Sequence, residues 1–427
     1  MPHDGELNVS QRELLISRQN KGLGFLDHDL YPDDVAKLDW NLLREDLSLP
    51  VAVLYQDKML QNLDWMRRFI SIYGVRLAPH GKTTMAPKLF DLQIRGGAWG
   101  ITLATAHQCF IAWQYGVRRV LMANQLVGKQ NMAIVSHLIA DPNFEYYCLV
   151  DSADAVHELG RFFSARGQSL RVLLEVGVAN GRCGVRNNEQ LRAVLDALDQ
   201  WSGSILLSGV ELYEGILDNE PEIRALLERA TAITKHLIAA NRIERKPPLL
   251  SGAGSAWFDV VADVFTKEVF PEPVEIVLRP GCYVTHDAGF YREAQAKVLE
   301  RNSVASRMYG GLQPALQVWG YVQSVPEKSK AVVGIGKRDV SFDLSLPFPV
   351  LQFRPGMQRP NPAPRRWVIS KLMDQHAYLA IEPEDDVRVG DMVGFDISHP
   401  CLTFDRWRTI PVVNSQYQVI DLVQTYF

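Results

Sequence analysis

The sequence lacks any apolar run long enough to cross a bilayer, and its polar first 22 residues lack the apolar centre of a secretory signal. It also lacks an excess of either charge. Lys and Arg number 45 against 49 Asp and Glu, so the net charge is -4 and no long basic block offers a surface for nucleic acid. These absences predict a cytoplasmic protein that binds neither a membrane nor nucleic acid.

Cysteine is scarce and scattered. Five cysteines, an odd number at wide spacing, exclude the disulfide framework of a small secreted domain, so we expect free thiols. Cys401 stands apart from the others because it lies two residues after His399. A GxGxxG motif is also missing after the early strands, which removes the best local argument for a dinucleotide-binding sheet.

An alternation of short apolar runs and longer amphipathic stretches fills the chain from residue 51 to about residue 290. It begins with an expected strand at Val51–Tyr55 and a helix over 57–73. Further strands are expected at 100–102, 120–122, 145–150, 171–176, 206–213, 248–251 and 275–278. About eight such units predict an α/β fold with a TIM-like (β/α)8 barrel, and a doubly wound open sheet is the competing architecture.

The sequence pattern changes after about residue 291, where closely spaced apolar strands are separated by Gly and Pro. Strands are expected at 316–322, 330–333, 341–344, 377–381, 392–396 and 411–414, and the Pro-rich stretch 354–365 is expected to be an exposed loop. We therefore predict a barrel over 49–290 and a mostly β domain over 291–427. The N-terminal segment 1–48 is expected to pack with the second domain.

Lys82 is the first candidate for chemistry. It follows an apolar strand in the string Val75-Arg-Leu-Ala-Pro-His-Gly-Lys-Thr-Thr84, and catalytic groups gather at the carboxyl ends of barrel strands. A lysine that is partly desolvated there has a lowered pKa, which frees its amine to bond to a carbonyl carbon.

Two further patterns suggest ligands. The small residues of Ser251-Gly-Ala-Gly-Ser255 follow a late strand, where converging backbone N–H groups bind an anion such as phosphate, although a flexible turn is the simpler reading. In an extended segment, His399 and Cys401 would point to one side. Imidazole and thiolate suit zinc, and two protein ligands would leave positions open for water or substrate.

The string Pro79-His80-x-Lys82-Thr83 resembles the cofactor-lysine motif of the alanine racemase-like, fold type III enzymes that use pyridoxal 5'-phosphate. Within that family it resembles the branch of D-serine dehydratase and D-threonine aldolase, and the resemblance extends over most of the chain. It implies that Lys82 bonds to the cofactor aldehyde and that zinc, or another divalent metal, binds His399 and Cys401. The other cofactor contacts that it implies are His80, Arg182, Tyr213, Gly252, Gly254, Ser255 and Tyr283. The alternative for Tyr283 is packing between the barrel and the second domain, and the alternative for His80 is a strand-end histidine bonded to the backbone.

The resemblance implies a lyase that eliminates the β-hydroxyl of a D-hydroxyamino acid such as D-serine, giving a 2-oxo acid and ammonia. The aldolases of the branch typically carry a carboxylate where this chain has Cys401, which favours elimination. Retro-aldol cleavage of the D-threonine aldolase type and amino-acid racemisation are the alternatives. Relatives of this kind are generally homodimers, and the sequence does not fix the preferred D-amino acid.

Overall fold

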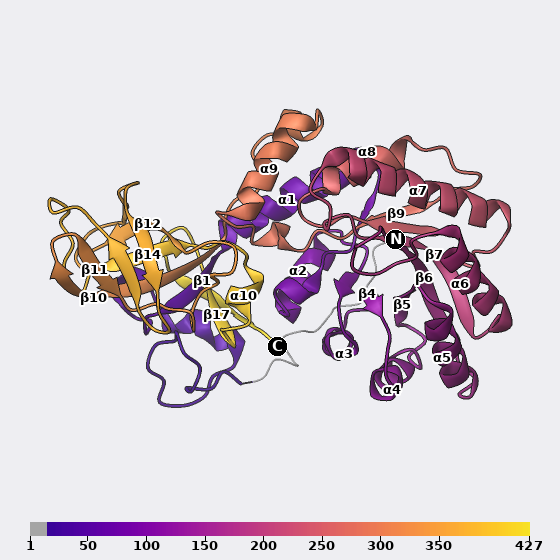
Figure 1. Cartoon of the computed structure of the whole chain (residues 1–427). Coiled ribbons are helices and arrows are strands. Elements are labelled where there is room, and N and C mark those ends of the chain that lie inside the picture. Colours follow the sequence, from indigo (N-terminus) through magenta and orange to yellow (C-terminus); the bar gives the residue numbers. More distant parts are fainter. Residues whose placement is uncertain (1–14) are drawn as a thin grey trace.

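A computed structural model describes residues 15–427 as two bodies that lie side by side, a barrel with its helices and a β domain (Figure 1). Among the described residues, no helix is both long and apolar enough to cross a membrane. The α/β barrel with a second, mostly β domain that the sequence predicts is confirmed.

The barrel is a curled sheet of eight parallel strands in the order β2-β9-β8-β7-β6-β5-β4-β3. A parallel bridge between His80 and Thr102 joins the two edges, where the Thr102 hydroxyl also donates to the Ala78 carbonyl at 2.7 Å. The strands are β2 (Arg76–Leu77), β3 (Ile101–Leu103), β4 (Arg119–Gln125), β5 (Glu145–Val150), β6 (Leu170–Val176), β7 (Ile205–Leu212), β8 (Leu249–Gly252) and β9 (Glu275–Leu278).

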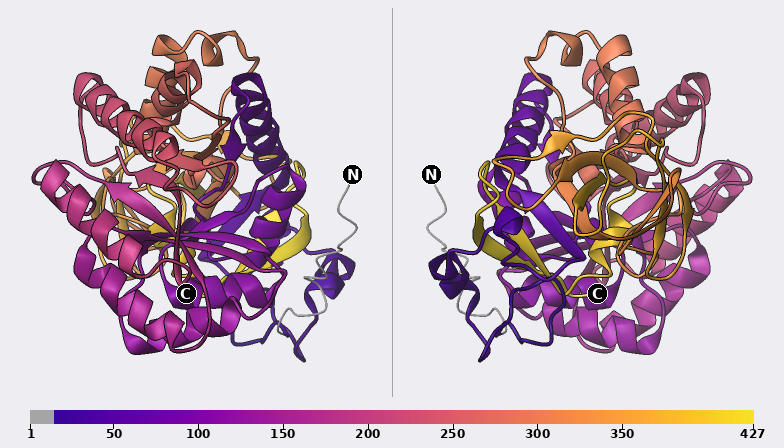
Figure 2. Two further views of the ribbon diagram at one scale, coloured as in Figure 1. Left: turned by 90° about the vertical axis from the view of Figure 1, so that its right-hand side faces the viewer. Right: turned by 90° about the vertical axis from the view of Figure 1, so that its left-hand side faces the viewer.

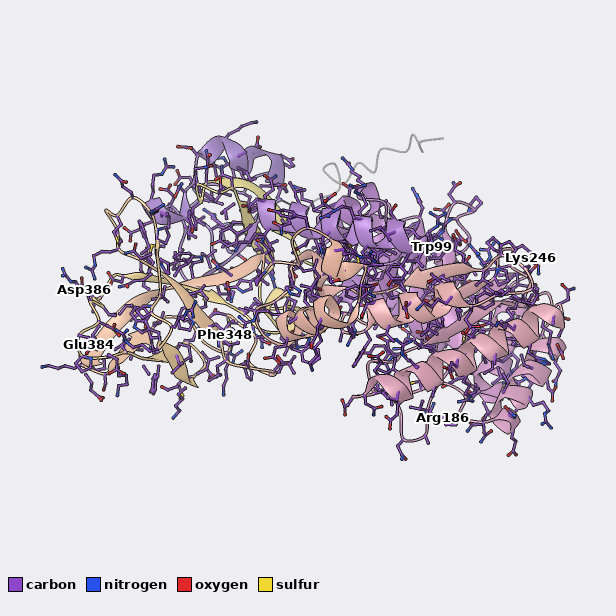
Figure 3. The ribbon with its side chains drawn as sticks, turned by 90° about the horizontal axis from the view of Figure 1, so that it is seen from above. Trp99, Arg186, Lys246, Phe348, Glu384 and Asp386 are labelled. Carbon is purple, nitrogen blue, oxygen red and sulfur yellow. The ribbon has the colours of Figure 1, made fainter. Side chains whose placement is uncertain are left out.

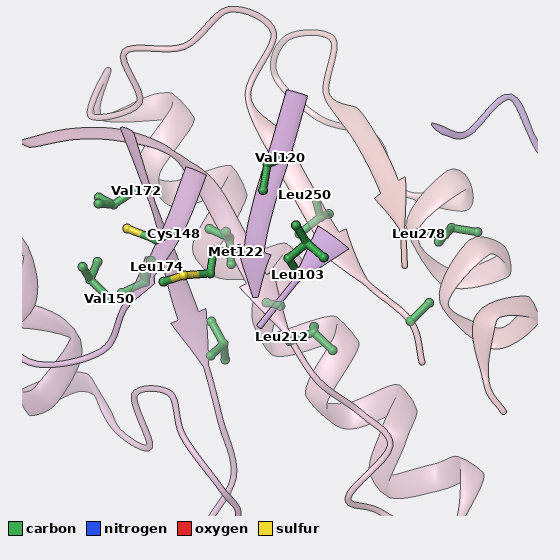
Figure 4. Packing of buried hydrophobic residues seen from close by; sticks show 14 of the residues in the cluster. Leu103, Val120, Met122, Cys148, Val150, Val172, Leu174, Leu212, Leu250 and Leu278 are labelled. Carbon is green, nitrogen blue, oxygen red and sulfur yellow. The ribbon is translucent and has the colours of Figure 1, made fainter. Parts of the chain in front are cut away.

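Helices surround this sheet on its outer side (Figure 2, left). They are α1 (Gln56–Tyr73), α2 (Pro87–Arg95), α3 (Ala106–Gln114), α4 (Lys129–Leu138), α5 (Ala153–Ser164), α6 (Asn188–Gln200), α7 (Glu220–Ala239), α8 (Phe258–Lys267) and α9 (Phe290–Arg301). Four of them begin after a side chain that accepts a hydrogen bond from the first turn, namely Thr105, Ser152, Asn187 and Asn219. The largest hydrophobic cluster lies between strands and helices and includes Leu103, Met122, Cys148 and Leu250 (Figure 4).

The carboxyl ends of the barrel strands face the β domain. Lys246 precedes β8 and lies at the end of the barrel remote from Glu384 and Asp386, which mark the far end of the β domain (Figure 3). Side chains that follow the barrel strands are therefore brought to the junction of the two bodies, which is where a barrel enzyme binds its substrate.

The β domain is a ten-stranded sheet with the main path β13-β12-β16-β10-β1-β17-β18, while β11, β15 and β14 extend it through β10. Its strands are β1 (Val51–Tyr55), β10 (Leu316–Glu327), β11 (Lys330–Val333), β12 (Phe348–Phe353), β13 (Asn361–Pro362), β14 (Val368–Leu372), β15 (Ala377–Ala380), β16 (Met392–Asp396), β17 (Thr409–Val413) and β18 (Val419–Gln424). All its pairings are antiparallel except that of β1 with β17.

The expectation that Val51–Tyr55 is a barrel strand is wrong. This strand, β1, pairs with β10 and β17 in the β domain, and the first barrel strand is β2. All five residues are buried, because Ala52 and Leu54 face one hydrophobic cluster while Val51 and Val53 face another. A strand buried on both faces has the continuous apolar pattern of a barrel strand, so the sequence alone does not separate the two.

Two further expectations in the β domain need correction. Residues 341–344 form no strand, because the backbone and hydroxyl groups of Ser341 bond to Thr403 and Ser398 instead. In the expected loop 354–365, Asn361 and Pro362 form the exposed edge strand β13. The described part of the N-terminal segment lies against this domain, where the amide of Val419 donates to the Trp40 carbonyl at 2.8 Å. The exact domain boundaries stay predictions.

Replacing Gly209 by alanine is expected to destabilise the barrel. A Cβ atom at this position in β7 would lie 2.0 Å from the carbonyl oxygen of Leu249 in β8, so the two strands would have to separate. We expect a loss of about 1–3 kcal/mol in urea unfolding. Gly311→Ala is the matched control, since its nearest neighbour is 3.8 Å away, and equal unfolding midpoints for the two variants would contradict the packing described here.

Candidate active site

Lys82 stands in a short 3-10 turn, Gly81–Thr83, that follows β2 at the mouth of the barrel. Glycine is needed before it, because a Cβ at position 81 would lie 2.7 Å from the ring of Phe90. The lysine side chain keeps an exposed part, while its amine lies among the charged groups of the mouth. Burial lowers the pKa of Lys82, and Arg182 lowers it further, against the opposing effect of Cys401. At a given pH, a larger fraction of its amine is therefore in the neutral, nucleophilic form.

His80 precedes the lysine and lies next to the bridge that closes the barrel. Burial holds the pKa of His80 well below its usual range, and the positive charges of Lys82 and Arg279 add to this effect. Its Nδ1 atom is buried without a hydrogen-bond partner among the described residues. The mouth of the barrel thus contains a neutral imidazole with a free nitrogen.

A layer of paired charges lies beneath these groups, at the carboxyl ends of β6, β7 and β9. Glu175 and Glu211 are register neighbours, and Arg279 forms a buried ion pair with Glu211 and donates to the Leu212 carbonyl at 2.9 Å. Burial and the neighbouring Glu211 raise the pKa of Glu175 to about 8. Above this layer, the guanidinium carbon of Arg182 lies 4.6 Å from the centre of the Tyr213 ring.

The small-residue loop after β8 binds an anion of the chain itself. The amides of Ala253 and Gly254 donate to the carboxylate of Glu214 at 3.0 and 2.6 Å, and Glu214 is fully buried. Next to them, the Ser255 hydroxyl accepts a hydrogen bond from the Cys282 amide at 3.2 Å. Two of the loop amides therefore already have a partner, a buried carboxyl group whose pKa is raised by burial. Sequence reasoning missed Glu214, which occupies two of these donors.

Tyr283 and Cys282 are adjacent and have different surroundings. Tyr283 belongs to the hydrophobic cluster between the barrel and its helices, and a hydrogen bond with Gln93 engages its hydroxyl group. These surroundings favour the packing role over a cofactor contact. The Cys282 thiol contacts the Thr83 hydroxyl at 3.7 Å and therefore lies beside the lysine turn.

His399 and Cys401 come to the barrel mouth from the β domain. The expected extended geometry is wrong, because His399 has the left-handed φ of 61° and Cys401 opens the short helix α10 (Cys401–Phe404). A hydrogen bond nevertheless joins the two side chains, and the Cys401 sulfur lies 3.5 Å from the Thr83 hydroxyl. Hydrogen bonds from Cys282, His399 and Thr83 lower the pKa of Cys401 to about 4.

Two aspartates that the sequence did not assign hold this pair in place. Asp287 accepts the backbone N–H of His399 at 2.8 Å through one oxygen, and through the other it accepts the amide of Tyr291 at 2.8 Å. The Nδ1 atom of His399 lies 2.5 Å from a carboxylate oxygen of Asp343. A carboxylate on one imidazole nitrogen is the usual support of a metal-binding histidine, because it leaves Nε2 for the ion.

A second group of potential metal ligands is less suited to a cation. Oxygen and sulfur atoms of Asp151, Glu175 and Cys183 lie within 4.8 Å of one another. Asp151 already accepts the Gly184 amide at 2.9 Å, and the raised pKa of Glu175 favours its neutral form. We therefore place the candidate metal site at His399 and Cys401.

Family comparisons agree with both bodies of the structure. The family described as alanine racemase, N-terminal domain, matches residues 55–262, and the family described as putative serine dehydratase domain matches residues 315–413. The chain belongs to the alanine racemase-like, fold type III family of pyridoxal-phosphate enzymes. The family resemblance given by the lysine motif is thereby confirmed.

Individual relatives of this family are distant in sequence. The chain is 23% identical over 312 residues to 3-hydroxy-D-aspartate aldolase of Paracoccus denitrificans (strain Pd 1222), covering 71% of this chain and 76% of the relative. It is 22% identical over 344 residues to D-threonine aldolase of an Arthrobacter species, covering 79% and 81%. Both relatives are named as aldolases of D-hydroxyamino acids.

Solved structures share the fold. A D-threonine aldolase from Filomicrobium marinum superposes with a TM-score of 0.71 at 23% identity, covering 91% of this chain and 97% of the other. D-threo-3-hydroxyaspartate dehydratase from Delftia sp. HT23 gives 0.70 at 22%, covering 90% and 99%. Variants of that dehydratase replace a histidine or a cysteine by alanine, with one residue between the two positions, and the cysteine variant is described as a metal-free form.

Replacing Glu175 by glutamine is expected to change how stability depends on pH. The folded pKa of Glu175, about 8, lies above the unfolded value of about 4.3. Its contribution to stability is therefore full below about pH 4.3 and is lost as the pH rises through about 8. The urea midpoint of the parent protein should fall more between pH 6 and pH 8.5 than that of Glu175→Gln.

Glu189→Gln, on the exposed part of α6, is the matched control and should keep the parent's response to pH. If the urea midpoint of Glu175→Gln falls with pH as much as that of the parent protein, a group other than Glu175 causes the pH dependence.

Proposed function

We propose that the chain is a pyridoxal-phosphate-dependent, metal-assisted lyase that removes the β-hydroxyl of a D-hydroxyamino acid such as D-serine. D-Serine would give pyruvate and ammonia. The observation that carries the proposal is the meeting of Lys82 and Cys401 at one turn, because the Thr83 hydroxyl next to the lysine contacts the cysteine sulfur. Relatives named for dehydratases and aldolases of D-hydroxyamino acids support the same class of substrate.

The residues at the barrel mouth fit the cofactor. Lys82 has an amine of lowered pKa, and His80 has a free buried nitrogen. We assign the amine bond to Lys82, the ring to Arg182 and Tyr213, and the phosphate to Gly252, Gly254 and Ser255. When bound, pyridoxal phosphate supplies an electron sink for the electrons left at Cα.

The protein's own part begins with Lys82. The lysine amine would act as the base toward the Cα proton of the substrate, and its lowered pKa suits it to this role. The guanidinium groups of Arg182 and Arg279 oppose a second positive charge there, which helps the lysine to release the proton again. Arg182 would orient the ring, and its position over Tyr213, the other residue assigned to the ring, supports this role.

His399 and Cys401 would hold the metal ion, which we take to be zinc. Imidazole and thiolate suit this ion, and His399 has the supporting carboxylate of Asp343. A zinc ion there supplies a Lewis acid for the leaving hydroxyl group. Asp287 fixes the backbone of His399 and thus the position of both ligands relative to Lys82.

Retro-aldol cleavage is the second candidate, because it needs the same lysine and metal and because two relatives are named as aldolases. Racemisation would need a second base on the opposite face of the cofactor. A homodimer and a cytoplasmic location stay predictions from the sequence.

A panel of D-amino acids tests the proposal. The purified protein with pyridoxal phosphate and zinc should release pyruvate and ammonia from D-serine, and activity should fall on chelation and return with zinc. Lys82→Ala should lose the absorption band of the lysine-bound cofactor and lower the rate at least ~100-fold. Lys129→Ala, at the exposed start of α4, is the matched control and should keep both.

Product analysis separates the candidates. With D-threonine, elimination gives 2-oxobutanoate and ammonia, whereas retro-aldol cleavage gives glycine and acetaldehyde. Glycine and aldehyde as the only products would replace the dehydratase by an aldolase. Exchange of the Cα proton of an unhydroxylated amino acid with formation of its enantiomer would indicate a racemase.

A further inference from the structure

The proposed function assigns no role to Cys282. It follows β9, opens the 3-10 turn Cys282–Val284, and is only 4% exposed. Its sulfur lies 3.7 Å from the Thr83 hydroxyl, which is the same hydroxyl that contacts the Cys401 sulfur at 3.5 Å. A third soft donor, from the barrel, therefore lies next to the two from the β domain.

The known chemistry of zinc sites favours three protein ligands over two. Catalytic zinc sites commonly have three protein ligands and leave a fourth position for water or substrate, and two cysteines with one histidine is one of the established sets. Thiolate and imidazole ligands together select zinc over the hard cations, which prefer oxygen. Cys282, Cys401 and His399 supply this set.

The charge balance around the metal gives an independent reason for a third protein ligand. A divalent ion on one thiolate and one neutral imidazole leaves a net positive charge next to Lys82, Arg182 and Arg279, and the two guanidinium groups already lower the pKa of Lys82. A second thiolate cancels that charge. The cancellation matters most at buried positions such as that of Cys282, because charges interact more strongly where water is excluded.

Hydrogen bonds position two of the residues that carry these donors, His399 and Cys282. Asp343 engages Nδ1 of His399, and the Cys282 amide donates to the Ser255 hydroxyl. Among the described residues, the three donor atoms do not all lie within 4.8 Å of one another, so the ion must draw them together.

We propose that Cys282 is a third protein ligand of the metal, so that the ion is bound by two sulfur atoms and one nitrogen and joins the barrel to the β domain. This inference rests on the proposed function in one respect, that a metal binds His399 and Cys401. Its consequence for the reaction is a single open position on the metal, which is sufficient for the hydroxyl oxygen of one substrate.

Cobalt binding tests this ligand without relying on activity. The full-length protein is reduced, stripped with a chelator and titrated with Co²⁺, and the sulfur-to-cobalt charge-transfer band is recorded. The parent protein should show about twice the band intensity of Cys282→Ser and of Cys282→Ala. Both variants should also bind the ion at least ~10-fold more weakly, as judged by competition with a chromophoric chelator.

Cys148→Ser is the matched control, because Cys148 is a buried thiol remote from the site and its replacement should leave the band unchanged. Circular dichroism and the absorption of bound pyridoxal phosphate show that each variant is folded. A band of parental intensity and affinity in both Cys282 variants would overturn the inference.

The outcomes also separate this inference from the proposed function. If Cys401→Ser loses the cobalt band while the Cys282 variants keep it, the metal site stands and only the third ligand is wrong. If the parent protein binds cofactor but no Co²⁺, both the third ligand and the metal-assisted step are overturned.

Discussion

The hydrogen bond from the backbone of His399 to Asp287, 2.8 Å long, is the contact on which the candidate site depends. Asp287 follows the last barrel strand and also receives the amide of Tyr291 in α9 through its second oxygen. It therefore fixes a segment of the β domain against the end of the barrel. This contact brings Cys401 to the turn that carries Lys82. The candidate metal ligands and the candidate cofactor lysine, which are far apart in the sequence, therefore lie at one site.

Several ionisable groups at the barrel mouth have shifted pKa values. Burial raises the pKa of Glu175 and lowers the pKa of Lys82 and His80, so each of these groups is shifted toward its neutral form. Burial also raises the pKa of Glu211, and its ion pair with Arg279 acts against this shift. Groups with shifted pKa values thus gather at the barrel mouth, and this arrangement suits general acid and base chemistry.

Much of the fold was predictable from the sequence, because the barrel strands alternate regularly with amphipathic helices. The exception is instructive: β1 lies between two hydrophobic clusters and shows no alternation, so its pattern does not tell which sheet it joins. The sequence predicts a strand at 341–344, yet the polar groups of Ser341 bond to Ser398 and Thr403, some 60 residues later.

The candidate site, like the fold, was only partly predictable from the sequence. Lys82, His399 and Cys401 were identified because short motifs carry them. Glu214, Asp343 and Cys282 were missed as site residues, because their roles arise from contacts with segments distant in the chain, such as the bond of Glu214 to the Gly254 amide. No local pattern marks a carboxylate that supports a remote histidine or loop.

The central claim is that one amine, that of Lys82, bonds to the cofactor aldehyde. The most direct measurement is to reduce the cofactor-loaded protein with borohydride, digest it and locate the modified lysine by mass spectrometry. The account predicts that the pyridoxyl mass is found on the peptide that contains Lys82. Modification of a different lysine with Lys82 left free, or no modification in a protein that absorbs like a bound cofactor, would contradict it.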